Sequence, residues 1–376
     1  MLIKNCKIIY EDRIEEGSVL LHNGKIKSIN PENTDEKDVM DAEGLYLSPG
    51  FIDVHIHGAG GHDTMDGTYE SLNIISKTIA KYGTTSFLPT TMTCSTSDIN
   101  KALETIKEAK LKGTDGANIL GAHLEGPFIS PKAIGAQNPD FVENPYLQTF
   151  LDIVGDNIDT VVSVTIAPEI EGACELIAYL RDKDITASMG HTKATYEEAM
   201  VGIQCGVSHS THLFNAMTGL HHRDPGVVGA IFDSSITTET ISDGIHISYP
   251  SLRIAYKQKG LDKVLLVTDA MMACSMPDGI YSLGGQKVIV ENGAARLKSG
   301  SLAGSILTLD KAVRNVYNNT DYPLNEIVNM ATVNPAKLCK VDTFKGSIKE
   351  GFDADLLLFD DGINVKKVII NGNVIL

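Results

Sequence analysis

Eight short apolar runs alternate with amphipathic stretches through the centre of the chain, and this alternation constrains the fold more than any other feature. Helical periodicity is clear between several of the runs, for example over residues 97–111 and 195–205. Strands that alternate with helices form a parallel sheet, because each helix carries the chain back to the start of the next strand. The predicted strands cover residues 50–58, 84–91, 118–126, 160–168, 185–191, 208–215, 238–247 and 263–270.

Eight such units predict a closed TIM-type (β/α)8 barrel, with an open doubly wound sheet as the alternative. The barrel is favoured because many of the strands end in polar residues, which a barrel gathers at one face. A chain of 376 residues leaves room for a smaller domain beside a barrel. Both chain ends carry short strands with Asn-Gly turn signals. We therefore expect an α/β protein in which residues 1–48 and 337–376 form a small β-sandwich domain and residues 49–336 form the barrel. Residues 279–297 are expected to insert a hairpin after the eighth strand.

Composition argues against several classes of function. The net charge of −16 argues against general binding of nucleic acid. No apolar run approaches the roughly 20 residues that a membrane span needs, so we expect no membrane partner. The N-terminus is typical of a strand rather than of a signal peptide, so a cytoplasmic location is expected. The six cysteines are scattered without a CxxC pair, which favours buried packing roles over disulfides or a thiolate zinc site.

The first predicted strand carries candidate metal ligands. Residues two apart in a strand share a face, so Asp53, His55 and His57 point one way and the isoleucines and valine between them point the other. Two imidazoles about 7 Å apart along a strand can lean onto one ion. Taken alone, this pair fits a metal site and a pair of hydrogen-bonded core histidines equally well.

The other strand ends favour the metal site. A histidine or a carboxylate recurs at the end of six of the eight predicted strands. In a barrel these side chains meet at one face, and imidazole with carboxylate is a ligand set for zinc, ferrous iron or manganese. His123 and His209 are expected to support the site or pack beside it rather than to be ligands. The candidates at strand ends are His55, His57, Glu125, His191, His212, His246 and Asp269.

Seven short motifs are spread along the chain: PGFIDVHIHG (49–58), HLEGPF (123–128), MGHT (189–192), HLFNAM (212–217), DGIH (243–246), TDA (268–270) and LAGS (302–305). With these motifs the chain resembles the amidohydrolase superfamily and, within it, the N-acetylglucosamine-6-phosphate deacetylase family. The resemblance covers nearly the whole chain, and the combination of HLEGPF, HLFNAM and DGIH is specific.

The resemblance implies a role for each matching residue. Metal ligands would be Glu125, His191 and His212, joined by His55 and His57 where a second ion is bound and bridged by Glu125. Asp269 would be the catalytic aspartate at the metal centre. The implied cofactor is zinc or ferrous iron, with one or two ions per subunit. Gln137 stands where some relatives have a histidine, so its contact with the sugar is open. The implied substrate contacts are Gln137, Asn215, Ala216, Arg223, His246, Leu302, Ala303 and Gly304.

The implied reaction is hydrolysis of the acetamide of N-acetylglucosamine-6-phosphate to glucosamine-6-phosphate and acetate, a step of amino-sugar metabolism. A metal-activated water would attack the carbonyl while Asp269 accepts a proton and passes it to the leaving amine. His246 would help to stabilise the oxyanion. No serine or cysteine nucleophile lies in a convincing triad.

Three alternatives stay open from the sequence. The first is the N-acetylgalactosamine-6-phosphate isomer as substrate. The second is another amidohydrolase activity, disfavoured because Glu125 lies where ring-opening relatives commonly carry a bridging lysine. The third is a non-catalytic scaffold, disfavoured because the whole ligand set is retained. The resemblance also implies a homodimer in which Arg223 reaches the neighbouring site, while His221 and His222 beside it could hold an anion or simply be solvated.

Overall fold

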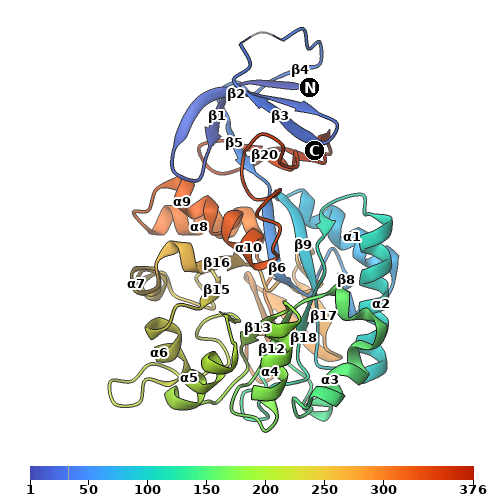
Figure 1. The fold of residues 1–376 in the computed structure, drawn as a ribbon, viewed down its shortest axis with the longest axis vertical. Helices are drawn as coiled ribbons and strands as arrows, with labels where there is room; N and C mark the ends of the chain where they lie inside the picture. The colour runs from blue at the N-terminus through green and yellow to red at the C-terminus, as the bar shows by residue number, and fades with distance from the viewer. Residues whose placement is uncertain (33) are drawn as a thin grey trace.

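A computed structural model describes residues 1–32 and 34–376. It has a barrel and, beside it, a sheet built from the two chain ends, with both termini in that sheet (Figure 1). No helix in these ranges is long and apolar enough to cross a membrane.

The terminal sheet joins strands from both chain ends, as the sequence predicts. β5 pairs with β20 in antiparallel register, so that Pro49 lies opposite Leu356. The strand order is β22-β21-β20-β5-β1-β2-β3, and β4 pairs with β1. Ile3, Leu47 and Ile369 are among the side chains that fill its own buried core. The strands are β1 (Leu2–Ile9), β2 (Ile14–His22), β3 (Lys25–Ile29), β4 (Val39–Asp41), β5 (Tyr46–Pro49), β20 (Leu356–Phe359), β21 (Val365–Ile370) and β22 (Asn373–Val374). We propose domain boundaries at residues 48–49 and 336–337.

The barrel contains every strand predicted for it, all parallel. β16 returns to β6 through a parallel bridge between Ile56 and Ala270, which nearly closes the ring. The third predicted strand is split near Gly121 into β10 and β11. A side chain at position 121 would be crowded, because its Cβ atom would lie 2.5 Å from Val162 Cγ2. The strands are β6 (Phe51–Ile56), β9 (Thr84–Thr91), β10 (Asn118–Ile119), β11 (Ala122–Glu125), β12 (Val161–Ile166), β13 (Thr186–Met189), β14 (His209–Ser210), β15 (Thr237–Ile241) and β16 (Val264–Val267).

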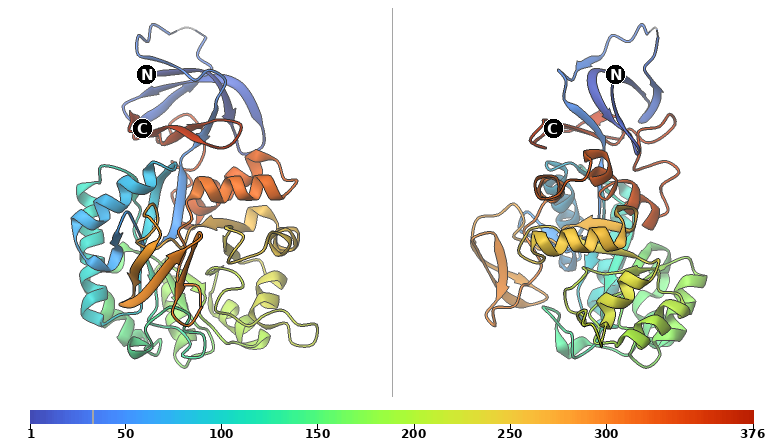
Figure 2. Two further views of the ribbon diagram at one scale, coloured as in Figure 1. Left: turned by 180° about the vertical axis from the view of Figure 1, so that it is seen from behind. Right: turned by 90° about the vertical axis from the view of Figure 1, so that its left-hand side faces the viewer.

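Helices surround the barrel, and the capping residues show why they begin where they do. The Ser95 side chain accepts from the Asp98 amide at the start of α2, and Thr195 forms a capping box with Glu198 at the start of α5. α8, α9 and α10 lie on the side that faces the terminal sheet (Figure 2). The α-helices are α1 (Tyr69–Ala80), α2 (Thr96–Lys112), α3 (Leu147–Val154), α4 (Ala173–Asp182), α5 (Tyr196–Cys205), α6 (Gly226–Asp233), α7 (Tyr249–Lys259), α8 (Leu309–Asn319), α9 (Leu324–Asn329) and α10 (Val333–Leu338).

Several short elements complete the chain. The segment expected to be a hairpin after the eighth strand is a three-stranded antiparallel sheet, in which β18 pairs with both neighbours. Its Leu283 and Val288 pack with Met92 beside the open end of the barrel. The strands are β17 (Gly279–Leu283), β18 (Gln286–Glu291) and β19 (Ala294–Leu297), with a small pair β7 (Gly58–Ala59) and β8 (His62–Asp63). The 3-10 helices are η1 (Thr64–Asp66), η2 (Pro139–Phe141), η3 (Gly155–Thr160) and η4 (Leu261–Lys263).

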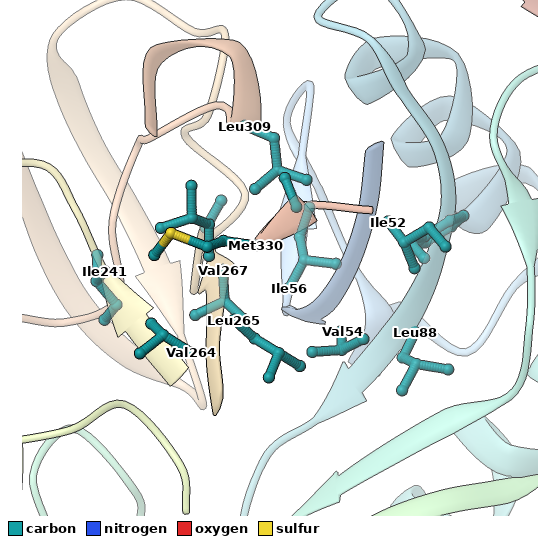
Figure 3. Packing of buried hydrophobic residues seen from close by; sticks show 14 of the residues in the cluster. Ile52, Val54, Ile56, Leu88, Ile241, Val264, Leu265, Val267, Leu309 and Met330 are labelled. Carbon is teal, nitrogen blue, oxygen red and sulfur yellow. The ribbon is translucent and has the colours of Figure 1, made fainter. Parts of the chain in front are cut away.

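The first barrel strand divides its side chains between two environments, as its alternation predicts. Ile52, Val54 and Ile56 belong to the large apolar core, which also contains Leu309 of α8 and Met330 (Figure 3). The polar residues between them take part instead in the network of polar contacts inside the barrel. This division directs the imidazoles of β6 towards the barrel axis.

The expectation that all cysteines are packing residues is wrong for two of them. Cys174 in the first turn of α4 and Cys205 at the end of α5 form a disulfide, with their Cα atoms 5.4 Å apart. Their separation of 31 residues carries no recognisable pattern. Only the side-by-side packing of the two helices brings them within the distance that a disulfide can bridge.

Candidate active site

The two histidines at the end of β6 meet the carboxylate at the end of β11. Nε2 of His55 lies 3.3 Å from Glu125 Oε1, and Nε2 of His57 lies 3.2 Å from Glu125 Oε2. All three residues are at least 98% buried. The parallel register brings these strand ends to one level, so residues 70 positions apart in the chain become neighbours.

His191 and His212 approach Glu125 from the following strands. Their Nε2 atoms lie 3.3 and 3.1 Å from Glu125 Oε1 and 3.1 Å from each other. Both residues have a positive φ, 46° and 27°, in the left-handed region that non-glycine residues rarely adopt. Such strain is often found where a side chain must be aimed at a functional site.

Asp269 completes the cluster from the end of β16. Its Oδ1 lies 3.3 Å from His57 Nε2 and 3.6 Å from His55 Nε2. Its φ is also positive, at 48°, and its side chain remains 12% exposed. Asp269 is therefore the carboxylate of the cluster with the better access to a bound molecule.

The donor set fits a divalent cation. Three groups of ligand atoms each lie within 4.8 Å of one another: His55 with His57 and Glu125, Glu125 with His191 and His212, and His55 with His123 and Glu239. Glu125 belongs to the first two groups. Nε2 of His55 is buried without a hydrogen-bond partner, although it faces two carboxylates. Buried imidazole nitrogens directed at carboxylate oxygens are typical of zinc and ferrous iron sites.

Electrostatics keep the cluster charged. Burial raises the pKa of Glu125, but the imidazoles of His55 and His191 outweigh that effect and hold the pKa well below its usual value. Burial lowers the pKa of His57, but the hydrogen bonds to Asp269 and Glu125 outweigh it and raise the pKa to about 9. A cation that binds here competes with these protons, so binding should release them.

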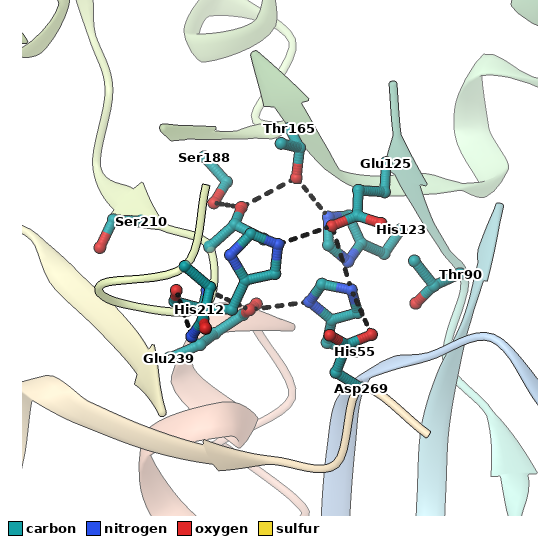
Figure 4. A network of polar contacts seen from close by, with 12 residues as sticks. His55, Thr90, His123, Glu125, Thr165, Ser188, Ser210, His212, Glu239 and Asp269 are labelled. Atoms are coloured by element: carbon teal, nitrogen blue, oxygen red, sulfur yellow. Dashed lines mark hydrogen bonds and ion pairs between the residues drawn. The ribbon is translucent and has the colours of Figure 1, made fainter. Parts of the chain in front are cut away.

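Hydrogen bonds on the far side of three imidazoles determine which nitrogen faces the cluster. Nδ1 of His57 bonds to the Thr90 carbonyl at 3.2 Å, and Nδ1 of His191 bonds to the Ala133 carbonyl at 2.9 Å. Nδ1 of His55 bonds to a carboxylate instead, Glu239 Oε2 at 2.8 Å (Figure 4). These partners leave Nε2 of each ring for the cluster.

A cavity of about 250 Å³ opens beside the cluster. His246 enters it with Nδ1 held by Asp243 Oδ2 at 2.7 Å, which leaves Nε2 for a ligand. Ala216 has a φ of 50°, which sets the direction of the main chain at the cavity wall. The predicted substrate contacts among the lining residues are Gln137, Asn215, Ala216, His246, Leu302 and Gly304.

Three of the predicted contacts are either engaged by other residues or lie outside the cavity lining. Gln137 lines the cavity, but its amide is engaged, since Oε1 accepts from the Thr93 amide and Nε2 donates to Glu125 Oε2 at 2.6 Å. Ala303 is fully buried and does not line the cavity. Arg223 is exposed on the loop before α6, outside the cavity lining, with Nη1 2.8 Å from His222 Nε2.

Two carboxylates that support the site had no role assigned from the sequence, although Asp243 lies in the DGIH motif. Asp243 holds His246, and Glu239 contacts His55 and the main chain of His212. A signal for Glu239 was present, because a carboxylate in the middle of a buried strand is rare unless it is paired. Met92 and Leu283 also line the cavity and had no polar signature to single them out.

Comparisons with known proteins show which family the chain is similar to. The chain is 39% identical to the N-acetylglucosamine-6-phosphate deacetylase of Bacillus subtilis (strain 168), over 100% of this chain and 96% of the relative. It is 35% identical to the N-acetylgalactosamine-6-phosphate deacetylase of Escherichia coli O157:H7, over 96% of this chain and 95% of that protein.

Solved structures repeat the whole architecture. The N-acetylglucosamine-6-phosphate deacetylase of Pasteurella multocida superposes with a TM-score of 0.94 at 34% identity, covering 99% of this chain and 98% of its own. A sequence model described as the amidohydrolase family matches residues 46–375. With barrel, ligand set and full-length relatives in agreement, the chain belongs to the amidohydrolase family.

Proposed function

We propose that this enzyme hydrolyses the acetamide of N-acetylglucosamine-6-phosphate to glucosamine-6-phosphate and acetate. The observation that carries the proposal is the pair of ligand groups that share Glu125 beside Asp269 and the cavity. Full-length relatives named for this reaction support the choice of substrate. A solved aspartate-to-alanine variant of the Mycobacterium smegmatis enzyme, 28% identical with a TM-score of 0.93, is in complex with N-acetyl-D-glucosamine-6-phosphate.

The proposed cofactor is zinc or ferrous iron, with one or two ions per subunit. Glu125, His191 and His212 would hold one ion, and His55 and His57 would complete a second position that shares Glu125. A bound ion of this kind would lower the pKa of its water to roughly 7 and polarise the substrate carbonyl.

Asp269 is the proposed proton carrier. Its carboxylate faces both the cluster and the cavity, so it can accept a proton from the attacking water and later pass it to the leaving amine. His246, held through Nδ1, would direct Nε2 towards the developing oxyanion or a sugar hydroxyl.

The proposed phosphate contacts come partly from a second subunit. Asn215 and the Ala216 amide lie in the cavity wall, whereas Arg223 is exposed outside it. We propose a homodimer in which Arg223 reaches the neighbouring site, because a guanidinium can bind phosphate oxygens in a bidentate manner.

The galactosamine isomer is the second candidate substrate, favoured by the relative at 35% identity that is named for it. The decisive experiment measures acetate release from both sugar phosphates on one preparation whose metal content is determined in parallel. We expect release that depends on metal and prefers the glucosamine compound. A preparation that binds metal but releases acetate from neither compound would refute the proposed function.

Hybrid dimers test the role of Arg223. Arg223→Ala should raise KM for the phosphorylated sugar and leave the unphosphorylated sugar almost unchanged. Mixing Arg223→Ala with Asp269→Asn protein should recover activity, because one site of each hybrid regains both groups. Subunit exchange is verified by tagged pull-down, and exchange without recovery would place Arg223 in the site of its own subunit.

A further inference from the structure

Glu239 lies in the middle of β15, and its buried carboxylate receives three hydrogen bonds. Oε2 is 2.8 Å from His55 Nδ1 and accepts from the His212 amide at 3.0 Å. Oε1 is 3.3 Å from His209 Nε2. The first two contacts reach residues of the metal cluster that come from different strands (Figure 4). No step in the proposed reaction uses this carboxylate.

The contact with His55 determines the tautomer of the ring. A carboxylate only accepts hydrogen bonds, so Nδ1 of His55 must carry the hydrogen. In a neutral imidazole this leaves the lone pair on Nε2, the atom that faces Glu125 and Asp269 without a hydrogen-bond partner. Without Glu239 the hydrogen could move to Nε2, and the ring would present a donor where a metal ligand is needed.

The contact with His212 stabilises a strained main chain. The φ of 27° at His212 departs from ordinary strand geometry, and the Glu239 side chain satisfies the amide at that residue. His209, one strand away from Glu239, supports the carboxylate from its other oxygen. Its own Nδ1 is 2.6 Å from Thr237 Oγ1, so the support rests on a second, partly buried pair.

We propose that Glu239 is a positioning residue that holds His55 with Nε2 free for the metal ion and steadies the His212 turn. The inference rests on the metal site of the proposed function and extends it to a residue outside both proposed ion positions. Partners of this kind commonly contribute about 10–100-fold to metal affinity. Because Glu239 contacts the His55 ring directly but only the amide of His212, the ion that needs His55 should depend on it more.

The test measures cobalt and zinc binding to the metal-free full-length protein, by competition with a chromophoric chelator and by the cobalt absorption spectrum. Glu239→Leu removes the hydrogen-bond acceptor. Binding of the ion that needs His55 should then weaken by about 100-fold, and the cobalt absorption spectrum should change. Glu239→Gln keeps an oxygen for His55 and His212, so the loss should stay near 10-fold. Ser210→Ala is the matched control, since Ser210 is buried on β14 and its hydroxyl donates to Thr238 at 2.6 Å rather than to a proposed ligand.

A double-mutant comparison separates positioning from general stability. If Glu239 acts through His55, Glu239→Gln should reduce metal affinity much less in the His55→Ala background than in the parent protein. An equal loss in both backgrounds would overturn the inference. The inference would also be overturned if Glu239→Gln bound both ions with the same affinity as the Ser210→Ala control. This comparison does not require Glu239→Leu to fold. A parent protein that binds no ion would instead refute the metal site of the proposed function.

Discussion

Two buried clusters of carboxylates lie at opposite ends of the barrel strands, and their charges are neutralised in different ways. Near the strand starts, Lys345 Nζ lies 2.8 Å from Asp353 and 2.5 Å from Asp355, whose other oxygen accepts from the Asn371 amide at 2.7 Å. At the strand ends, Glu125 and Asp269 lie among imidazoles. The first cluster has its cation built into the chain, whereas the second offers ligands to a cation from solution.

The difference shows how one fold separates stability from catalysis. A buried carboxylate needs a compensating charge, and a lysine supplies one permanently but leaves no place for an exchangeable ligand. Imidazoles leave that place open, because a cation that binds displaces their protons and takes up the lone pairs. The lysine cluster lies where the terminal sheet meets the barrel, since Asn118 at the start of β10 donates to Asp355 at 3.4 Å. Changes there should affect folding alone, and changes at the strand ends should affect activity.

The largest effect is expected from Glu125→Ala. Glu125 belongs to both proposed ion positions, so its loss should remove bound metal and reduce acetate release to background. His55→Ala should mainly lower the occupancy of one ion. Metal analysis and activity on the same samples check this. If Glu125→Ala kept full metal content and full rate, the cluster at the strand ends would not be a cation site, and its contrast with the Lys345 cluster would fail.

Asp269→Asn should have the next largest effect. The amide keeps the size of the carboxylate but cannot accept a proton, so kcat should fall roughly 10²–10⁴-fold. Metal content should remain close to that of the parent, because the other ligands are unchanged. Steady-state kinetics and metal analysis measure both quantities, and near-normal turnover would exclude Asp269 as the proton carrier.

Lys345→Met should affect stability rather than chemistry. Its loss leaves the buried carboxylate of Asp355 without its cation, while Asp353 keeps Lys25, and the loss of one partner of a buried ion pair costs about 3–5 kcal/mol in free energy of unfolding. Metal content and KM should not change. Lys349→Met is the control, since Lys349 pairs with Glu11 at 2.6 Å but is 55% exposed, where ion pairs contribute about 0–1 kcal/mol. Urea unfolding compares the variants, and equal losses for both lysines would contradict the burial argument.

The smallest effect concerns pH. Burial raises the pKa of Asp353, but hydrogen bonds from Lys25 and Lys345 outweigh it and hold the pKa below its usual value. The unfolded chain therefore binds this proton more readily, so the stabilisation is present above the unfolded pKa of about 3.9 and is lost as pH falls through the folded pKa. The free energy of unfolding should fall less steeply below about pH 4 in Asp353→Asn than in the parent. Urea unfolding between pH 3 and 6 measures the free energy of unfolding of both proteins. Parallel pH dependences would show that Asp353 does not contribute to acid destabilisation.

Local patterns explain how much of the molecule was predictable. The barrel strands follow from apolar runs of strand length, and the direction of His55 and His57 follows from the period of two along β6. Strand-end histidines and carboxylates predicted the members of the cluster, because parallel strands bring their ends to one face. The pairing of both chain ends was predictable because each end carried the alternation and turn signals of strands.

The amino-acid sequence by itself thus determined the barrel, its terminal sheet and the residues gathered at the strand ends, because residue type and local periodicity encode them. Tertiary structure alone decided what each side chain touches. Glu239 acquires its role from donors on two other strands, Gln137 turns its amide towards Glu125, and Cys174 meets Cys205 across two helices. These contacts depend on which strands and helices become neighbours and on the register between them, and no pattern within a short stretch of chain records either quantity.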